Sequence, residues 1–298
     1  MRTFILTVLL LTLALIMPPR PALGQKVSLE DSIKNLSRDV GGTVGVAAKS
    51  FDKKVSFQVN GQAHFPMQSV MKFPLALAVL HRVDQGILAL SQKVHLSKAD
   101  LSTPTFSPIR DKYPEGDVDL TIDSLLRYTV SQSDNIGCDK LFQILGGPGA
   151  VNDYVHQVGV KEIQIVATEK QMGQDWQTQY RNWCSPNAML RLLELFQSGS
   201  LLSKNSHDYL WQLLLETVNA PNRIRGLLPA NAVVAHKPGT SGVNAEGIAA
   251  ATNDVGIIEL PNQQRFAVAI LVSNATAALP DRERTIAHIA RLFWNCWQ

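Results

Sequence analysis

The chain has 298 residues, of which 45% are apolar and 18% are charged, and its formal net charge is +3. The first 24 residues hold two arginines and no acid, so the remaining 274 residues carry a net charge of only +1. This charge balance argues against a nucleic-acid-binding protein, which usually shows a concentrated basic patch. The apolar share excludes a disordered chain. The length is that of about two domains.

The first 24 residues have the pattern of a secretory signal peptide. Arg2 gives a positive start, and the apolar run from Phe4 to Met17 is shorter than the roughly 20 residues that span a bilayer. Small residues for cleavage lie at 22–24. We therefore expect export, a mature chain from about Gln25, a periplasmic location and no membrane anchor after cleavage.

Strand patterns lie at both ends of the remaining chain. A helix is predicted after the capping residue Ser28, and Gly41 and Gly42 end it. A hairpin of residues 43–48 and 55–59 follows. Near the other end, segments rich in Val, Ile and Ala predict three strands, and a last amphipathic helix follows: 233–236, 248–260, 266–273 and a helix that opens at Pro280.

Between these ends, from about residue 69 to 218, helical periodicity dominates. The clearest segments are 122–130, 140–145, 150–158, 187–196 and 207–218. The simplest architecture is of the α/β (α+β) class, with one antiparallel sheet built from both ends of the chain and the helical block inserted as a second lobe. Catalytic sites often lie between two such lobes.

The chain contains three cysteines, at positions 138, 184 and 296. Because this count is odd, at least one thiol stays free or pairs between chains. Neither the cysteines nor the seven histidines show metal-ligand spacing. We expect buried thiols, no metal site and no cofactor.

Ser69 and Lys72 begin an apolar helical run, and residues three apart share one face of a helix. A lysine shielded from water can take the proton of a serine and so make it a nucleophile. Pro74 is awkward in this position, since a proline beyond the first turn kinks a helix. Taken alone, the pair is a weak signal.

Two further polar motifs follow. The tripeptide Ser133-Asp134-Asn135 offers a hydroxyl that could pass a proton and an amide that could hold a carbonyl, although an ordinary polar turn has the same composition. The segment from His236 to Gly242 ends a Val-rich strand. Its lysine, Lys237, could polarise the Ser133 hydroxyl, and a backbone N–H there could donate to an oxyanion.

In this order and spacing, the three motifs match the signature of class A β-lactamases and penicillin-binding proteins. The whole mature chain resembles a class A serine β-lactamase. The segments 65–69, 235–237 and 250–254 look like the extended-spectrum PER/VEB-type branch.

The resemblance implies a serine β-lactamase/DD-peptidase-like fold, with a five-stranded antiparallel sheet flanked by helices and an all-helical lobe. One lobe would comprise residues 25–60 and 219–298, and the helical lobe residues 61–218, with an omega loop at about 164–182. The implied catalytic residues are Ser69, Lys72, Ser133, Glu169 and Lys237. The implied substrate contacts are Gln68, Asn135, Arg223, Thr240 and Ser241.

In that mechanism Ser69 attacks the β-lactam carbonyl, and Lys72, or Glu169 acting through water, accepts its proton. The N–H groups of Ser69 and Thr240 would hold the oxyanion, and Glu169 would activate the hydrolytic water. An arginine such as Arg223 suits a bidentate grip on the substrate carboxylate.

Four positions depart from the common family pattern. Pro238 replaces a residue with a hydroxyl, Gly173 replaces a water-holding asparagine, Ala167 replaces an arginine that ties down the loop, and Asn182 replaces an aspartate. Proline also lacks an N–H, but we expect that N–H position to face the cleft, because the strand forms the sheet edge. Arg225 is expected at the surface, and His236 is expected to pack under the strand.

The sequence therefore predicts a monomeric enzyme that hydrolyses the β-lactam amide through an acyl-serine. Its substrates would be small-molecule penicillins and cephalosporins, including bulky oxyimino-cephalosporins. Two alternatives stay open. One is a penicillin-binding DD-peptidase, and the other is a β-lactam-binding sensor with weak deacylation.

Overall fold

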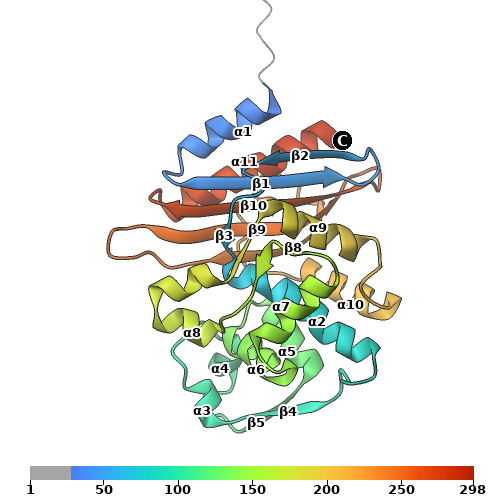
Figure 1. Ribbon diagram of the computed structural model, residues 1–298, viewed down its shortest axis with the longest axis vertical. Helices are drawn as coiled ribbons and strands as arrows, with labels where there is room; N and C mark the ends of the chain where they lie inside the picture. The colour runs from blue at the N-terminus through green and yellow to red at the C-terminus, as the bar shows by residue number, and fades with distance from the viewer. Residues whose placement is uncertain (1–27) are drawn as a thin grey trace, which may run out of the picture.

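Five antiparallel strands in the order β2-β1-β10-β9-β8 form the main sheet (Figure 1). The structure, a computed structural model, describes residues 28–298, so the predicted signal peptide lies outside the described residues. The strands come from both ends of the chain, as predicted: β1 (Thr43–Ser50), β2 (Val55–Val59), β8 (Val233–Thr240), β9 (Ala249–Glu259) and β10 (Arg265–Ala275). The predicted fold class is confirmed.

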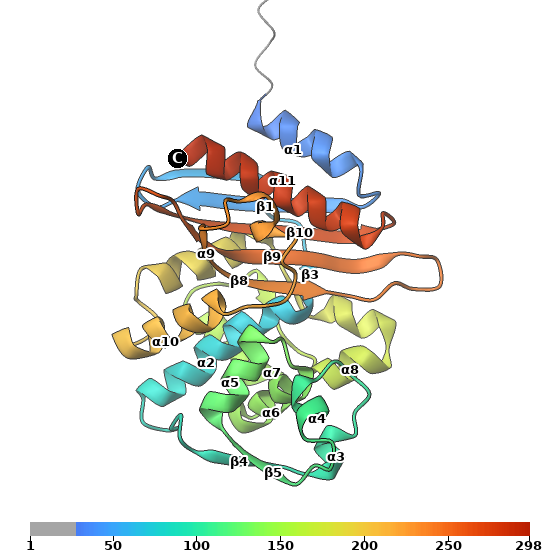
Figure 2. The ribbon, with the colours of Figure 1, turned by 180° about the vertical axis from the view of Figure 1, so that it is seen from behind.

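Two terminal helices cover one face of this sheet (Figure 2). They are α1 (Leu29–Arg38), which the Ser28 side chain caps as predicted, and α11 (Leu279–Trp297). The apolar residues of α11 recur at helical spacing and are fully buried: Ile286, Ile289, Ala290 and Phe293. They meet every second residue of β10, namely Val268, Ile270 and Val272, in one hydrophobic cluster.

The opposite face of the sheet packs on the helical block. The intervening residues of β10, Ala267, Ala269 and Leu271, belong to the same buried cluster as the helices. The expected division into lobes at residues 60 and 218 stays a prediction, because this cluster runs across both parts.

Helix α2 (Lys72–Asp84) lies in the middle of the helical block, and its residues from Lys72 to Leu80 are all buried. The other α-helices of the block are α3 (Lys98–Leu101), α4 (Pro108–Lys112), α5 (Ile122–Ser131), α6 (Asn135–Leu145), α7 (Pro148–Gln157), α8 (Glu169–Gln174), α9 (Pro186–Gln197) and α10 (Lys204–Leu215). Pro74 is the third residue of α2, so its missing N–H falls in the first turn, where no intrahelical bond is lost. The expectation of a kink was wrong for that reason.

Several short elements in and around the block escaped the sequence analysis. They are the strands β3 (Phe65–Pro66), β4 (Lys93–Leu96), β5 (Val118–Thr121), β6 (Ile163–Gln164) and β7 (Trp183–Cys184), and the 3-10 turns η1 (Gln68–Met71), η2 (Trp176–Arg181) and η3 (Ile224–Leu227). β4 pairs with β5, and β7 lies between β3 and β6. Strands of two to four residues are too short to show a repeating pattern.

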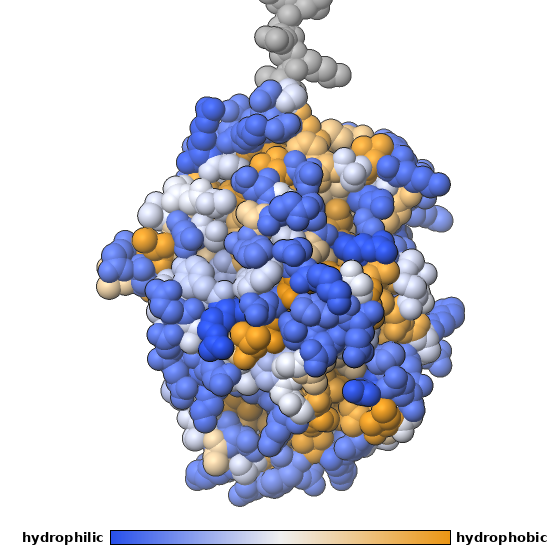
Figure 3. All heavy atoms as spheres, in the orientation of Figure 1, coloured by the Kyte–Doolittle hydropathy of each residue, from blue (hydrophilic) through white to orange (hydrophobic). Residues whose placement is uncertain are grey.

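On the face shown in Figure 3, hydrophilic residues surround scattered hydrophobic ones. Within residues 28–298, no helix combines the length and the apolar character needed to cross a membrane. The buried apolar residues form two clusters, one on each face of the main sheet.

Candidate active site

Ser69 lies on a tight turn between the sheet and the central helix. The turn η1 joins β3 to α2, and Gln68 has a left-handed backbone with φ of 49°. Strand β8 lies directly against this turn. A Cβ on Gly239 would come within 2.5 Å of the Met67 carbonyl oxygen and 3.2 Å of the Ser69 nitrogen. Glycine at 239 therefore lets the edge strand approach the serine backbone.

Lys72 connects the predicted catalytic groups. Its Nζ donates to the Ser69 Oγ at 2.9 Å, to the Ser133 carbonyl at 2.8 Å and to the Asn135 Oδ1 at 2.5 Å. It also forms an ion pair of 3.0 Å with Glu169 Oε1. The Lys72 side chain is fully buried, so this ammonium depends on protein partners rather than on water.

Glu169 begins the short helix α8, and its Oε1 lies 3.4 Å from the Ser69 Oγ. Thr168 and Gln171 form a capping box at the start of this helix. The Asp139 carboxylate accepts hydrogen bonds from the backbone nitrogens of Glu169 and Lys170, at 2.7 and 2.9 Å. The glutamate is thus fixed by its backbone beside the serine.

Asn182 closes the segment that carries Glu169. Its Oδ1 accepts from the backbone nitrogens of Val166 and Ala167, at 2.8 and 2.9 Å, and its Nδ2 donates to the Ala167 carbonyl at 2.7 Å. We call this set of three bonds the Asn182 clasp. It shows how the segment is held where Ala167 offers no long side chain.

Ser133 also has a left-handed backbone, with φ of 62°. Its Oγ accepts a hydrogen bond of 3.0 Å from the Lys237 Nζ. Burial, together with the nearby charge of Lys72, holds the pKa of Lys237 well below its usual range. Asp134, the middle residue of the motif, is fully buried and caps α6, because its Oδ1 accepts a hydrogen bond of 2.7 Å from the Gly137 nitrogen. Its role in the motif is therefore structural.

Strand β8 is the edge of the sheet, and its register explains the tolerance of Pro238. The Ser241 nitrogen donates to the Ala251 carbonyl, and Pro238 pairs with Asp254 three residues along. Since bonded and non-bonded pairs alternate in an antiparallel ladder, the nitrogen position of Pro238 faces away from β9, as does that of Thr240. The predicted orientation is therefore confirmed by the register.

Arg223 lies behind the site rather than open to it, with 2% of its surface exposed. Its Nη1 donates to the carbonyls of Gly239 and Asn253, its Nε to Glu283, and its Nη2 to the Thr240 hydroxyl at 2.6 Å. With these donors committed, a bidentate grip on a substrate carboxylate has no geometric support. The guanidinium instead holds Thr240.

Arg225 and His236 form part of the support of β8. Arg225 is only partly exposed and donates to the Val234 carbonyl at 2.5 Å and to His236 Nε2 at 3.3 Å. The expectation of a surface residue was therefore wrong. His236 is fully buried under the strand and lies 2.9 Å from Asp254, as predicted.

The hollow in front of Ser69 is lined by four of the ten predicted site residues, Ser69, Ser133, Asn135 and Thr240. It is lined by Ser69, Phe106, Ser133, Asn135, Asn219, Pro238 and Thr240. Gln68 and Ser241 are not among these residues. Gln68 donates to Gln179 of η2 at 2.5 Å, and the Ser241 hydroxyl is bonded to the backbone of Ala251. Phe106 and Asn219 were missed, because a lone aromatic or amide residue in a loop carries no sequence signal.

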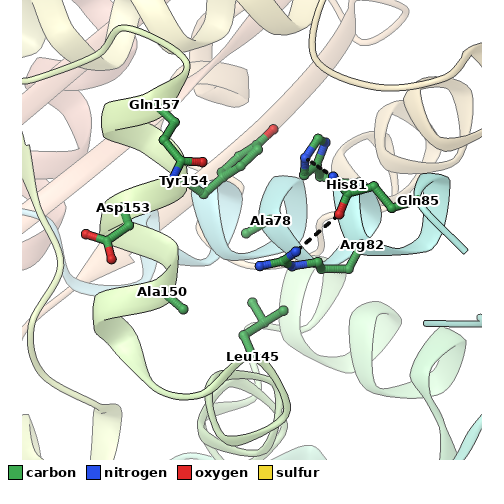
Figure 4. A pocket seen from close by; sticks show the side chains of 9 residues that line it. All are labelled: Ala78, His81, Arg82, Gln85, Leu145, Ala150, Asp153, Tyr154 and Gln157. Atoms are coloured by element: carbon green, nitrogen blue, oxygen red, sulfur yellow. Dashed lines mark hydrogen bonds between the residues drawn. The ribbon is translucent and has the colours of Figure 1, made fainter. Parts of the chain in front are cut away.

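A second hollow lies at the other end of α2, against α6 and α7 (Figure 4). Its polar lining includes His81, Arg82 and Tyr154. Burial and the charge of Asp84 raise the pKa of the Tyr154 phenol to about 12, so this hydroxyl stays neutral near pH 7. The hollow contains no nucleophile paired with a base, and the chemistry belongs to the hollow at Ser69.

A serine hydroxyl within reach of both a buried lysine and a carboxylate defines the class of enzymes that work through an acyl-serine. The chain belongs to the beta-lactamase enzyme family, whose model matches residues 28–297. It is a serine β-lactamase of class A, and the predicted family and enzyme class are confirmed.

Two curated relatives come from Pseudomonas aeruginosa. Beta-lactamase VEB-1 is 44% identical over 91% of this chain and 91% of its own length. Extended-spectrum beta-lactamase PER-1 is 42% identical over 90% of this chain and 86% of its own length. A crystal structure of a beta-lactamase from Chitinophaga pinensis is 46% identical and has a TM-score of 0.89, covering 91% of this chain and 99% of that one. The crystal structure of the TLA-1 extended-spectrum β-lactamase is 45% identical to this chain and has a TM-score of 0.87. The match covers 90% of this chain and 97% of that one.

Proposed function

We propose that this β-lactamase opens the β-lactam ring with Ser69 as nucleophile and releases the product with water activated by Glu169. The observation that carries the proposal is the position of Glu169, which lies 3.4 Å from the Ser69 Oγ while paired with Lys72. A carboxylate there can act on a water that attacks the acyl-serine, which is the step that a slowly deacylating sensor or peptidase lacks.

In the first half-reaction, the Ser69 Oγ bonds to the lactam carbonyl carbon, and the C–N bond of the ring breaks. The serine proton leaves through Lys72, or through Glu169 and a water, and a proton reaches the ring nitrogen from the Ser133 hydroxyl. Lys237 supports this transfer because its Nζ already donates to Ser133 Oγ. The outward N–H of Thr240 and the N–H of Ser69 are the proposed donors to the oxyanion.

In the second half-reaction, water adds to the ester carbon, one of its protons goes to Glu169, and the bond to Ser69 Oγ breaks. The serine regains a proton, and the opened product leaves as an acid. Asn135 helps to hold Lys72 in position, since its Oδ1 accepts a hydrogen bond from the Lys72 Nζ and its Nδ2 donates to the Thr105 hydroxyl.

We propose that the substrates include oxyimino-cephalosporins. The support is the similarity to PER-1 and TLA-1, which are described as extended-spectrum β-lactamases. We also propose that the enzyme acts in the periplasm without a membrane anchor, on the basis of the composition of residues 1–24. That it acts as a monomer stays a prediction.

The test replaces Glu169 with alanine. Glu169→Ala should acylate but fail to deacylate, so mass spectrometry should show a stable adduct of one cephalosporin per chain, and turnover should fall by about a thousandfold or more. Glu115→Ala, at a side chain 92% exposed, is the matched control and should behave as the parent. Unchanged turnover in Glu169→Ala would remove the glutamate from its role, and a parent enzyme that only labels without turnover would favour the sensor or peptidase.

A further inference from the structure

Asn219 lines the same hollow as Ser69 and Ser133, yet its side chain has no hydrogen-bond partner there. Its Oδ1 is buried and accepts from no group of the described residues, and its Nδ2 donates to none of them either. The residue as a whole is only partly exposed. An amide in such a position is usually satisfied by the protein, by water or by a ligand.

The backbone around Asn219 is held firmly. The Thr217 hydroxyl donates to the His236 carbonyl of β8 at 2.9 Å, and the Val218 nitrogen donates to the Ser131 carbonyl of α5 at 3.2 Å. Ala220 then turns the chain with a left-handed φ of 55°. Asn219 is therefore fixed between the strand that carries Lys237 and the helix that leads to Ser133.

The other polar residues that line the hollow are already committed inside the protein. Ser69 is bonded to Lys72, Ser133 accepts from Lys237, and the Thr240 hydroxyl accepts from Arg223. The amide of Asn135 is bonded at both ends, to Lys72 and Thr105. Within the lining, Asn219 is the polar side chain that makes no hydrogen bond to any of the described residues.

Two positions that could offer donors to an anionic substrate at this hollow do not do so. Pro238 has neither a hydroxyl nor an N–H, and the guanidinium of Arg223 is bonded to Gly239, Asn253, Thr240 and Glu283. Penicillins and cephalosporins carry a carboxylate next to the ring nitrogen, and that nitrogen must lie near Ser133 for proton transfer. Because Oδ1 is the buried end of the Asn219 amide, its nitrogen is the end available to such a carboxylate.

We propose that Asn219 is a specificity-determining residue whose amide nitrogen donates to the β-lactam carboxylate and so supplies the donor that Pro238 cannot. The inference rests on the proposed function of the Ser69 site. It assigns recognition of the substrate acid to the loop before η3 as well as to β8. A hydrogen bond to a charged acceptor is among the stronger kinds, so its loss should be measurable.

The first measurement compares one reporter cephalosporin as the free acid and as its methyl ester. Asn219→Ala should raise KM for the acid about tenfold, equivalent to about 1.4 kcal/mol of binding, with kcat within about twofold of the parent, and it should leave the kinetics of the ester unchanged. Asn219→Asp should raise KM for the acid further by repulsion. Val218→Ala, at a neighbour 69% exposed, is the matched control and should match the parent.

A double-mutant cycle with Pro238→Thr gives the second measurement. The new hydroxyl should replace the donor, so Asn219→Ala should raise KM less than threefold in that background. Equal losses in both backgrounds, or equal effects on acid and ester, would overturn the role of Asn219. A parent enzyme that turns over neither substrate would instead refute the proposed function, and matching melting temperatures of the variants would exclude a folding effect.

Discussion

Lys237 has an unusual position for a side-chain amine, since 1% of its surface is exposed and, among the surrounding charges, that of another lysine, Lys72, has the largest effect on its pKa. Both conditions disfavour the charged form and keep its pKa low. The arrival of a substrate carboxylate would reverse the second condition. A substrate carboxylate bound nearby would favour the charged form of Lys237, which links recognition of the acid to polarisation of Ser133.

Asp139 is a second residue whose charge conflicts with its surroundings. Burial raises its pKa to about 6, the charge of Glu169 acts in the same direction, and the bonds from the Lys170 and Glu169 nitrogens act in the opposite one. A raised folded-state pKa means that the folded protein favours the protonated acid. The stability that this preference contributes is present below about pH 4 and is lost as the pH rises through about 6.

We therefore expect Asp139→Asn to remove this pH dependence. The difference in unfolding free energy between variant and parent should shift in favour of the variant by up to about 3 kcal/mol between pH 4 and pH 7. Urea unfolding at several pH values measures this difference, and Asp153→Asn, at an exposed acid, is the control. A difference that is constant with pH would contradict the assignment.

At the level of elements, the segment from β6 to β7 depends on polar bonds more than on apolar packing. Helix α8 has six residues, too few for a stable isolated helix. The capping box, the Asp139 carboxylate and the Asn182 clasp supply its order. The position of Glu169 is thus set by four side chains, Thr168 and Gln171 of the capping box together with Asp139 and Asn182.

Asn182→Ala should break the clasp and leave buried backbone groups of Val166 and Ala167 without partners. We expect a loss of about 2 to 4 kcal/mol in unfolding free energy and slower deacylation than acylation, seen as a burst in stopped-flow traces. Asn231→Ala, at an exposed turn, is the matched control. A melting temperature equal to that of the parent would contradict the clasp.

Much of the fold could be predicted, because the long elements carry regular patterns. The three C-terminal strands and the helices α5, α7 and α9 match the expected segments to within a few residues. The hairpin of β4 and β5 could not be predicted from four-residue strands. In the site, the motifs located Ser69, Lys72, Ser133 and Lys237. Spacing alone could not show that the Arg223 guanidinium is hydrogen-bonded to other residues of the protein.

For the molecule as a whole, the three thiols differ in their exposure to solvent. Cys138 and Cys184 are fully buried in the helical cluster, as expected. Cys296 on α11 is exposed, so the expectation of a buried thiol was wrong there. Burial raises the pKa of both inner thiols. No two of the three form a disulfide.

Titration with Ellman's reagent should therefore detect one thiol in the reduced native protein and three after unfolding in guanidinium chloride. Reaction needs an accessible thiolate, and only Cys296 can supply one in the folded chain. Cys296→Ser should give no native reaction and two thiols after unfolding. A native count above one in the parent would contradict the packing of α2, α6 and β7 around the inner cysteines.

The strand order of the sheet has a consequence for the time at which the enzyme can assemble. Thr43 of β1 pairs with Ser273 of β10, about 230 positions later. Until β10 has been synthesised, β1 has only the hairpin partner β2, and an isolated hairpin is marginally stable at best. Such distant pairing slows folding. The nucleophile turn at Ser69 rests against the late strand β8, so the site can reach its folded form only once most of the chain is present.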